Sequence, residues 1–358
     1  MQATPAAPHA SGSLHQSDSQ QIRFAGTREG VEAALVARAG LDFVPISAGQ
    51  MHIRNPLRLA LNSGKMAKGG VQALRLMQQW RPDALFVTGG FVCAPVVWAA
   101  DRLRIPILIY LPDVTPGLAV QRLAHYAHQV AVTFPEVATY FPDKAIVTGY
   151  PVRQELRRRS LSEAEARLSF DLVPNRHTVL IFGGSRGSRS INQATAAILP
   201  DLLDSAQVLH ITGELDWESS KARAQGLTPD QQAGYRGFPY LHDDMVAALC
   251  AADMVVARAG ASTLGEFPAL GLPAVLVPLP ISGQHQLPNA RYLADRGAAE
   301  IVADADMNQK LLPTLRTLLA QPDRLAAMSG ASAALAQPDA ADRLADALLQ
   351  LSGAQRPN

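Results

Sequence analysis

The sequence predicts an α/β protein built from two doubly wound domains in tandem. Short apolar runs alternate with helical patterns along most of the 358 residues, and the series restarts after Pro151. Such alternation favours a parallel sheet with helices on both faces. Two such domains form a cleft between them, and ligands of such sheets bind beyond the carboxyl ends of the strands. Functional residues are therefore expected in the loops that follow the strands.

The first domain is expected over residues 22–150, after a tail. Residues 1–21 are rich in Ala, Ser, Pro and Gln, which is typical of a disordered tail, and they lack the charged and apolar regions of a signal peptide. The strand-like and helix-like runs that follow are QIRFAG, VEAALVARAG, ALFVTGG, PVVWAADRL, IPILIYL, GLAVQRLAHYA, QVAVTF and KAIVTG. Their order predicts successive β-α steps of a parallel sheet.

The second domain is expected over residues 151–352, with the boundary near TGYPVRQELRRRS. Its strands are predicted at TVLIFGG, AQVLHITG, DMVVARAG and PAVLVPLP. The third of these runs into small residues and then into a helix whose first turn carries Glu266. Unpaired N–H groups and the helix dipole favour a carboxylate there. Helix capping therefore explains Glu266 without any ligand.

Composition excludes several classes of function. Apolar residues make up 48% of the chain and the formal net charge is +1, as in an ordinary soluble globular protein, so no basic surface for nucleic acid is indicated. No apolar run reaches the 18 to 20 residues of a membrane span. Cys93 and Cys250 each lie in an apolar run, which favours two buried thiols over a disulfide or a metal site. No metal and no cofactor are expected.

A stretch between Asp42 and Asp83 contains no acidic residue. Its basic residues are interleaved with leucines and methionines, and they are Arg54, Arg58, Lys65, Lys68, Arg75 and Arg81. A basic amphipathic segment can lie on an anionic lipid surface, where each charge contributes on the order of 1 kcal/mol. Taken alone, the pattern more often marks a solvated helix over the core.

The loop GGSRGSRS after TVLIFGG has the composition of a phosphate site. Gly183, Gly184 and Gly187 permit close backbone approach, while Ser185 and Ser188 add hydroxyls ahead of a helix N-terminus. It matches neither G-x-G-x-x-G nor G-x-x-x-x-G-K-[ST], which argues against a standard dinucleotide or P-loop site. From this loop alone, a phosphate cradle and a tight βα turn are equally supported.

The loops after the other strands carry side chains suited to a sugar or a ribose, because hydroxyl-rich ligands need matched donors and acceptors. These residues are His242 in GFPYLHDDM, Gly260, Ser262, Thr263 and Glu266 in ARAGASTLGE, and Gln284, His285 and Gln286 in GQHQ. Beside a phosphate cradle, the carboxylate of Glu266 can accept both hydroxyls of a ribose. Asp304 and Asp306 form a D-x-D that resembles a metal motif, but they precede a helix, so capping is expected for them.

These motifs resemble the MurG-type glycosyltransferases of family 28. The second half carries IFGGSRGSRSINQ, YLHDDM, RAGASTLGEFPALGLPAVLVPLP and GQHQLPNARYLADRGAAEIV, and the first half carries GTREGVEAALVARAG, FVTGGFVCAPVVWAA, IPILIYLPDVTPG and VTGYPVR. The likeness covers residues 22 to about 305 and keeps the family's order. It implies the GT-B fold, with two Rossmann-like domains, an acceptor and membrane-side domain first and a UDP-sugar-binding domain second.

The resemblance also implies an activity. Members of this type are hexosyltransferases that move N-acetylglucosamine, with inversion, from UDP-N-acetylglucosamine to undecaprenyl-diphosphate muramyl-pentapeptide in peptidoglycan synthesis. The implied partners are this donor, the lipid-diphosphate acceptor and the inner face of the cytoplasmic membrane, where such enzymes are peripheral. The loops that begin at Ser185 and Ser262 are expected to stabilise the leaving diphosphate without a metal.

The resemblance assigns substrate contacts residue by residue. The set is Arg153, Gly184, Ser185, His242, Ala261, Ser262, Thr263, Leu264, Glu266, Gln284 and Gln286, with His285 as an alternative to Gln284. Within it, Ser185 faces the diphosphate, His242 the uracil and Glu266 the ribose. Gln286 lies at the N-acetylglucosamine, and Arg153 near the donor at the domain junction.

The catalytic base is not assigned by the resemblance. Asp113 is the remaining candidate, and it stands where many relatives carry Asn. The family also opens with a strand and a GGTGGH loop that contacts the acceptor diphosphate, whereas here only the tail precedes QIRFAG. The first strand and helix are therefore expected to be missing.

Three classes of function follow. The first is the peripheral membrane glycosyltransferase. The second is a chain that binds a UDP-sugar without turnover of its own, or that needs a partner to supply the missing loop. The third is another UDP-sugar enzyme, such as an epimerase. Transfer to a lipid-diphosphate acceptor separates the first two classes, and epimerisation of the free UDP-sugar identifies the third.

Overall fold

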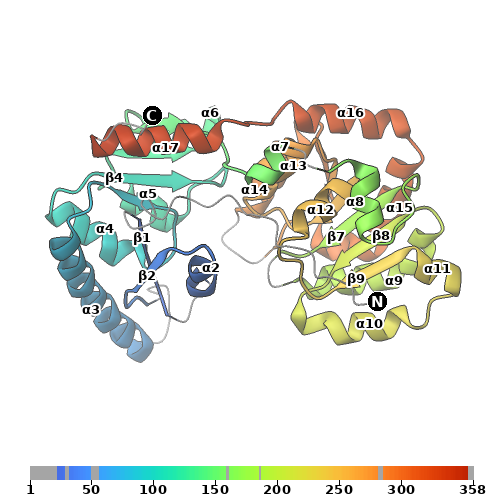
Figure 1. Ribbon diagram of the computed structural model, residues 1–358, viewed down its shortest axis with the longest axis horizontal. Helices are drawn as coiled ribbons and strands as arrows, with labels where there is room; N and C mark the ends of the chain where they lie inside the picture. The colour runs from blue at the N-terminus through green and yellow to red at the C-terminus, as the bar shows by residue number, and fades with distance from the viewer. Residues whose placement is uncertain are drawn as a thin grey trace, which may run out of the picture. The chain divides into compact units, whose positions relative to one another are not determined.

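The computed structural model describes residues 22–28, 32–49, 56–158, 161–184, 187–280 and 285–353. It confirms the α/β class. Two compact units are present, and the strand pairs of each are parallel (Figure 1). Among the described residues, the first unit comprises those within 22–109, 119–128 and 351–353, and the second comprises those within 110–118 and 129–350. This division differs from a boundary at residue 150, which stays a prediction, and the tail predicted over residues 1–21 lies outside the described residues.

The first unit contains two parallel strand pairs and the helices beside them. Its elements are β1 (Arg23–Gly26), α2 (Glu32–Arg38), β2 (Asp42–Pro45), α3 (Pro56–Trp80), β3 (Leu85–Val87), α4 (Cys93–Arg102), the start of β4 (Ile107–Leu111) and α5 (Leu118–Leu123). β1 pairs with β2 from Arg23↔Asp42, and β3 pairs with β4 from Leu85↔Ile107. The runs that predicted β1, α2, β3, α4, β4 and α5 are confirmed, whereas β2 was not predicted.

The long helix α3 packs against α4 and against the segment that follows β2. Gly69 permits this approach, because a Cβ there would lie 1.9 Å from the carbonyl oxygen of Ser47. The Ser47 N–H also donates to the side-chain oxygen of Gln72, at 2.8 Å. One face of α3 is thereby fixed to the unit.

The second unit is built around a six-stranded parallel sheet with the order β12-β11-β10-β7-β8-β9. Its strands are β7 (Thr178–Phe182), β8 (Gln207–Ile211), β9 (Tyr235–Phe238), β10 (Met254–Ala257), β11 (Ala274–Leu276) and β12 (Ala299–Ile301). β5 (Gln129–Val132) and β6 (Ala145–Val147) also pair in parallel, and they belong to the four-stranded sheet of order β3-β4-β5-β6. The central strands are buried along their whole length, which explains their continuous apolar runs. The four strands predicted for this region are confirmed, and β9 and β12 were not predicted.

Helices cover both faces of this sheet. The helices of this unit are α6 (Pro135–Ala138), α7 (Gln154–Arg158), α8 (Glu163–Ser169), α9 (Arg189–Leu203), α10 (Trp217–Ala224), α11 (Pro229–Ala233), α12 (Met245–Ala251), α13 (Thr263–Leu270), α14 (Gln286–Ala294), α15 (Met307–Leu319), α16 (Pro322–Ala333) and most of α17 (Ala340–Ser352), with short 3-10 turns η1 (Glu214–Asp216) and η2 (Asp304–Asp306). Of these, α6 packs against β5 and β6 and not against the six-stranded sheet. α9, α15 and α16 share one apolar core with the strands, while α12 packs on β7 beside α8. This is the doubly wound arrangement that the sequence predicts.

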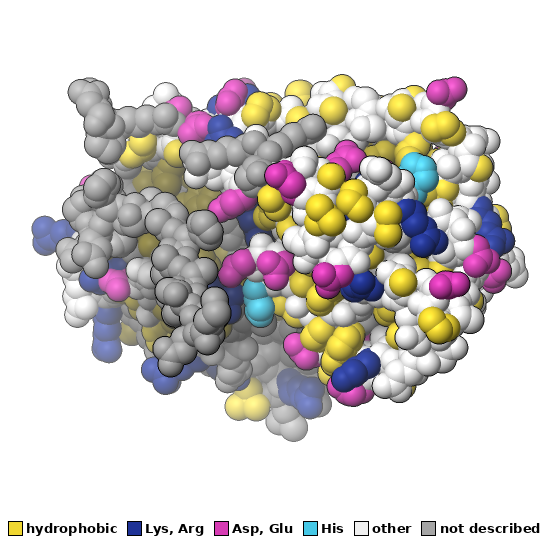
Figure 2. Space-filling view, turned by 45° about the vertical axis from the view of Figure 1, so that its right-hand side comes forward, with side chains coloured by type: hydrophobic (Ala, Val, Ile, Leu, Met, Phe, Trp, Pro, Cys, Tyr) yellow, Lys and Arg dark blue, Asp and Glu magenta, His cyan; other side chains and the backbone are white. Residues whose placement is uncertain are grey.

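Other composition-based expectations are met where the structure describes the chain. Cys93 and Cys250 are buried and unbridged. Hydrophobic, acidic and basic side chains are interspersed over the face that Figure 2 presents, in keeping with the balanced charge. Within the six described ranges, no helix has both the length and the apolar character that crossing a bilayer requires.

Candidate nucleotide-sugar site

Most predicted site residues of the second unit lie in loops at the carboxyl ends of its parallel strands. All six strands run in parallel, so the loops after them leave from the same edge. The chain passes from β7 through β8 to β9 and then returns to β10, which lies on the other side of β7. The loops after β7 and β10 therefore flank the point where the winding reverses, the usual ligand crevice of such sheets.

The loop after β7 has a shape that only glycines permit. Gly184 and Gly187 have φ of +94° and +73°. A Cβ on Gly183 would lie 2.3 Å from the backbone nitrogen of Ser188, and one on Gly187 would lie 2.2 Å from the carbonyl oxygen of Thr212. The loop is thus folded tightly on itself and against the end of β8. Gly184 is exposed, while Ser185 lies outside the described residues.

The loop after β10 leads into α13, whose first turn carries Glu266 as predicted. Thr263 and Leu264 are buried, at 2% and 1% exposed, and the Thr263 hydroxyl donates to the Gly260 carbonyl at 2.7 Å. Their side chains are therefore structural, and only their backbone is suited to a ligand. Half-buried Ala261 and Ser262 lie in the same turn, as does the partly exposed Glu266; their assigned ligand roles stay predictions.

Glu266 has charged and aromatic neighbours. Burial raises the pKa of its carboxyl group, and the positive charge of Arg153 acts in the opposite direction. Burial also raises the pKa of the Tyr150 phenol to about 12, and the negative charges of Glu266 and Asp113 add to this shift. The fold thus groups Glu266, Arg153, Tyr150 and Asp113, which are distant in sequence.

Asp113 is tied to α14 through Asn289. The Asn289 amide nitrogen donates to Asp113 Oδ1 at 2.8 Å and to the Ala259 carbonyl at 3.2 Å, and its oxygen accepts from the Val114 N–H at 3.0 Å. Asn289 is fully buried. This residue was not predicted, and it fixes Asp113 next to the loop after β10.

The start of α14 lies in the same region. The Gln286 side-chain oxygen accepts from the Leu279 N–H at 2.9 Å, which leaves its amide NH₂ group as the donor end. His285 Nδ1 lies 3.4 Å from the Thr115 hydroxyl. Gln284 lies outside the described residues. Gln286 is therefore oriented by the backbone at the end of the β11 segment.

His242 follows β9, one of the two outermost strands of the sheet, and β12 is the other. Its ring is exposed and lies against the ring of Tyr240, with 4.5 Å between centroids. β7 and β8 separate β9 from β10. The uracil contact assigned to His242 stays a prediction.

The D-x-D pair has partners other than a helix end. Arg258 lies with Nη1 2.5 Å from Asp304 Oδ1, and Asp306 pairs with Lys310 at 2.6 Å. Asp306 does precede α15, but its side chain makes no capping hydrogen bond. The capping expectation is therefore wrong for Asp304, because Arg258 binds its carboxylate. One sequence signal could have revealed this ion pair. Arg258 stands among the small and apolar residues of VVARAGA, and a buried cation needs a partner.

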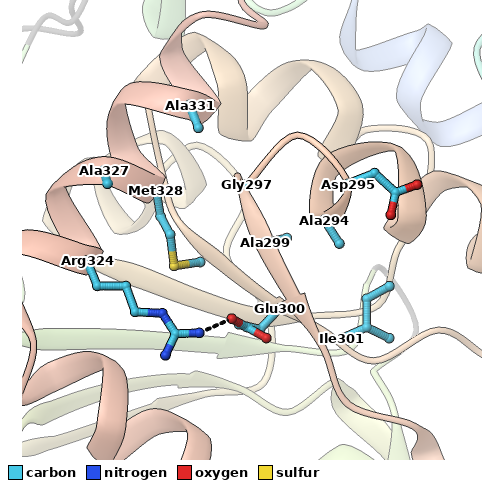
Figure 3. A pocket seen from close by; sticks show the side chains of 10 residues that line it. All are labelled: Ala294, Asp295, Gly297, Ala299, Glu300, Ile301, Arg324, Ala327, Met328 and Ala331. Atoms are coloured by element: carbon cyan, nitrogen blue, oxygen red, sulfur yellow. Dashed lines mark hydrogen bonds and ion pairs between the residues drawn. The ribbon is translucent and has the colours of Figure 1, made fainter.

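A separate depression of about 610 Å³ lies elsewhere in the second unit, between the edge strand β12 and α16. Figure 3 shows its lining, in which Arg324 and Glu300 form an ion pair and Met328 lies beside alanines. None of the predicted site residues lines it. The candidate site is therefore defined by its loops rather than by this depression.

The architecture, parallel α/β units with the predicted loops at the carboxyl ends of the strands, is that of two-domain GT-B glycosyltransferases. The Glycosyltransferase family 28 N-terminal domain matches residues 14–132, and the Glycosyltransferase family 28 C-terminal domain matches residues 178–344. The chain belongs to glycosyltransferase family 28.

Individual relatives agree with this assignment. A protein of Roseiflexus sp. (strain RS-1), named UDP-N-acetylglucosamine--N-acetylmuramyl-(pentapeptide) pyrophosphoryl-undecaprenol N-acetylglucosamine transferase, is 42% identical over 90% of this chain and 82% of its own. The protein of the same name from Desulforudis audaxviator is 38% identical over 98% and 95%. Among solved structures, MurG of Acinetobacter baumannii matches with a TM-score of 0.72 and 28% identity over 93% of each chain. A UDP-GlcNAc 2-epimerase from Neisseria meningitidis, at 13% identity and a TM-score of 0.63, shares the fold.

Proposed function

We propose that this chain transfers N-acetylglucosamine from UDP-N-acetylglucosamine to a lipid-diphosphate-linked muramyl-pentapeptide, with inversion at the anomeric carbon. The observation that carries the proposal is the position of Glu266. It stands in the first turn of α13, after the strand β10 that adjoins β7 and its glycine loop. A ribose on this carboxylate sets the diphosphate of the same nucleotide beside the glycine loop.

The donor contacts follow from this placement. Glu266 accepts the two ribose hydroxyls, and the backbone of the glycine loop at Gly184 faces the diphosphate. Arg153 is exposed near Glu266 and adds positive charge on the donor side. The Gln286 amide donates to the sugar, together with Gln284 or His285. The remaining contacts proposed are His242 at the uracil, and Ala261, Ser262, Thr263 and Leu264 beside the nucleotide.

The chemical step requires a departing diphosphate and an acceptor hydroxyl that loses its proton. Loop N–H groups and helix N-termini beside the glycine loop stabilise the charge that develops on UDP. Asp113 is the candidate base. Its Oδ1 accepts from Asn289, an arrangement that orients the second carboxylate oxygen. Asp113→Asn tests this role, because the amide retains the shape but does not take up a proton.

We propose a membrane contact through α3. Leu61 and Val71 are 68% and 48% exposed on this helix, and Lys65, Lys68 and Arg75 are exposed with them. Apolar side chains enter the headgroup boundary while the basic ones meet anionic lipid. Arg54 lies outside the described residues. Because the acceptor named for the relatives is lipid-linked, we propose a peripheral contact at the cytoplasmic face of the membrane.

Transfer of radiolabelled N-acetylglucosamine from UDP to a lipid-diphosphate muramyl-pentapeptide, in detergent, tests the activity. Product in the lipid phase is expected. UDP binding without product would indicate a chain that binds the donor without turnover. Conversion of the free UDP-sugar to its epimer would indicate an epimerase.

Sedimentation with vesicles tests the membrane contact. The chain is expected to bind vesicles that contain phosphatidylglycerol, and Lys65→Glu with Lys68→Glu is expected to release it. Lys221→Glu with Arg223→Glu on α10 is the matched control, because it makes the same charge change on a helix of the second unit. Equal release by both pairs would show a general charge effect and not a surface on α3.

A further inference from the structure

We infer that Arg258 is a positioning residue that keeps the diphosphate loop open, by holding the Ser188 hydroxyl away from the N-terminus of α9. The inference rests on the proposed function. Neither the sequence pattern nor the proposed donor contacts assign a role to Arg258.

The guanidinium group of Arg258 has a partner for each of its N–H groups. Nε and Nη2 donate to Ser188 Oγ at 3.1 and 2.8 Å, and Nη2 also donates to Ser190 Oγ at 2.7 Å. Nη1 donates to the Val277 carbonyl at 3.1 Å and contacts Asp304 Oδ1 at 2.5 Å. Arginine has five N–H donors, and these contacts engage them all. Arg258 is 8% exposed, so it acts through the loop and does not bind phosphate itself.

Ser188 directly precedes α9 in extended backbone, the position of a helix cap, yet its side chain makes no capping hydrogen bond. Two other helices of the same unit show the usual behaviour. Ser162 accepts from the Glu165 N–H before α8, and Thr228 accepts from the Gln231 N–H before α11. The difference at Ser188 has a visible cause, because two donors of Arg258 already point at its oxygen.

The consequence concerns the first turn of α9. The N–H groups of Arg189, Ser190 and Ile191 have no carbonyl within the helix to accept them, and a serine cap covers the second or third. With Ser188 drawn to Arg258, this cap is not made. The N–H groups at the end of the glycine loop then remain directed outward, where a diphosphate accepts them.

Asp304 completes the arrangement. Its Oδ1 accepts from the Ser190 hydroxyl at 2.9 Å as well as from Arg258. The loops after β7, β10 and β12 are thereby joined through one cation and one anion, so the net charge of the cluster is zero. The positive potential at the diphosphate loop comes from N–H groups and not from Arg258.

The test compares UDP with uridine, which lacks the diphosphate. In Arg258→Gln, the Ser188 hydroxyl is released to cap α9. UDP affinity is expected to fall by roughly tenfold or more, while uridine affinity stays within about twofold. Adding Ser188→Ala removes the competing cap and is expected to restore UDP affinity to within about threefold of Ser188→Ala alone. Amide hydrogen exchange at Ile191 is expected to slow in Arg258→Gln and to recover in the double variant.

Arg167→Gln is the matched control, because β10 carries a second buried ion pair at its other end. Arg167 Nη2 lies 2.8 Å from Asp253 Oδ2, just before β10, and the arginine side chain is 7% exposed. This variant is expected to destabilise the unit without a selective loss of UDP. Thermal unfolding of each variant shows that the binding data refer to folded protein.

Three results would overturn the inference: equal losses of UDP and uridine in Arg258→Gln, no recovery on adding Ser188→Ala, or the same selective UDP loss in Arg167→Gln. A loss of UDP binding in Ser188→Ala alone would also overturn it, by making that hydroxyl a direct ligand. If the unsubstituted chain fails to bind UDP, the proposed function fails instead.

Discussion

The ring of Tyr150 lies directly on the backbone of Gly265, in the first turn of α13. A Cβ on Gly265 would lie 2.3 Å from Tyr150 Cδ1. The next residue along the helix is Glu266, the proposed ribose acceptor. The contact between Tyr150 and Gly265 therefore fixes the position of the helix turn that carries this carboxylate. Tyr150 thus links the GYPVR segment to the candidate site.

Gly265→Ala is expected to destabilise the protein by roughly 1–3 kcal/mol, as overpacking does, because ring and helix must separate. Thermal unfolding measures the change. Gly330→Ala, in α16, is the control, since no heavy atom lies within 4 Å of a Cβ there. Equal effects of the two substitutions would contradict the contact. Replacing Tyr150 by Ala in the Gly265→Ala background is expected to relieve the clash.

Glu266→Gln is expected to weaken UDP binding by about 1–3 kcal/mol, the usual loss for charge-assisted hydrogen bonds. Calorimetry with UDP measures it. Glu218→Gln, an exposed first-turn residue of α10, is the control for loss of a helix-start charge. An affinity within about twofold of the unsubstituted chain would leave Glu266 with only a helix-start role.

The raised pKa of Glu266 predicts how binding depends on pH. The ionised carboxylate accepts the ribose hydroxyls, so nucleoside affinity should fall as pH drops through a value above the ordinary 4.5. Uridine is the probe, because it has no phosphate to titrate. Glu266→Gln should remove the dependence. Stability changes in the opposite sense: the penalty of a buried carboxylate is present above the raised pKa and disappears below it. A uridine affinity that does not vary with pH in the unsubstituted chain would exclude the carboxylate as the acceptor.

His210 predicts a loss of stability in mild acid. It is buried, and burial lowers its pKa from 6.5 to about 4. The unfolded chain therefore binds a proton that the folded chain does not, and stability falls as pH drops from 6.5 towards 4. At 1.36 kcal/mol per pKa unit the effect reaches roughly 3 kcal/mol. Unfolding of His210→Gln across this range should depend less on pH, and an unchanged slope would assign the effect to other groups.

Nucleotide binding is expected to survive chelation of divalent cations. Arg258 pairs with Asp304 and Lys310 pairs with Asp306, so both carboxylates of the D-x-D already have cationic partners. Titration of UDP in excess EDTA measures this. Loss of binding that magnesium or manganese restores would show that a metal displaces these partners.

The strands of the large sheet could be predicted because parallel strands buried on both faces form continuous apolar runs, as in β7 and β10. β9 reads Tyr-Arg-Gly-Phe and β12 reads Ala-Glu-Ile, and both are short strands at the sheet edges with mixed burial, so neither gives such a run. Local signals were also sufficient for Glu266, since a strand, small residues and a helix start follow one another there.

Long-range partners could not be predicted in the same way. Arg258 follows β10 and Asp304 follows β12, two strands that β11 separates in the sheet, and no sequence spacing encodes their ion pair. Asn289 lies in a helix, where its type suggests exposure, yet it is fully buried and binds Asp113. Such contacts depend on strand order, which the alternation of strands and helices leaves open.

The two thiols offer separate reporters of opening for the two units. Cys93 begins α4 in the first unit and Cys250 lies in α12 in the second, and they are 7% and 9% exposed. Burial raises the pKa of Cys93 to about 11, so its thiol stays protonated and unreactive while folded. A short pulse of alkylating reagent, followed by peptide mapping, therefore times the exposure of each unit independently within a single unlabelled chain.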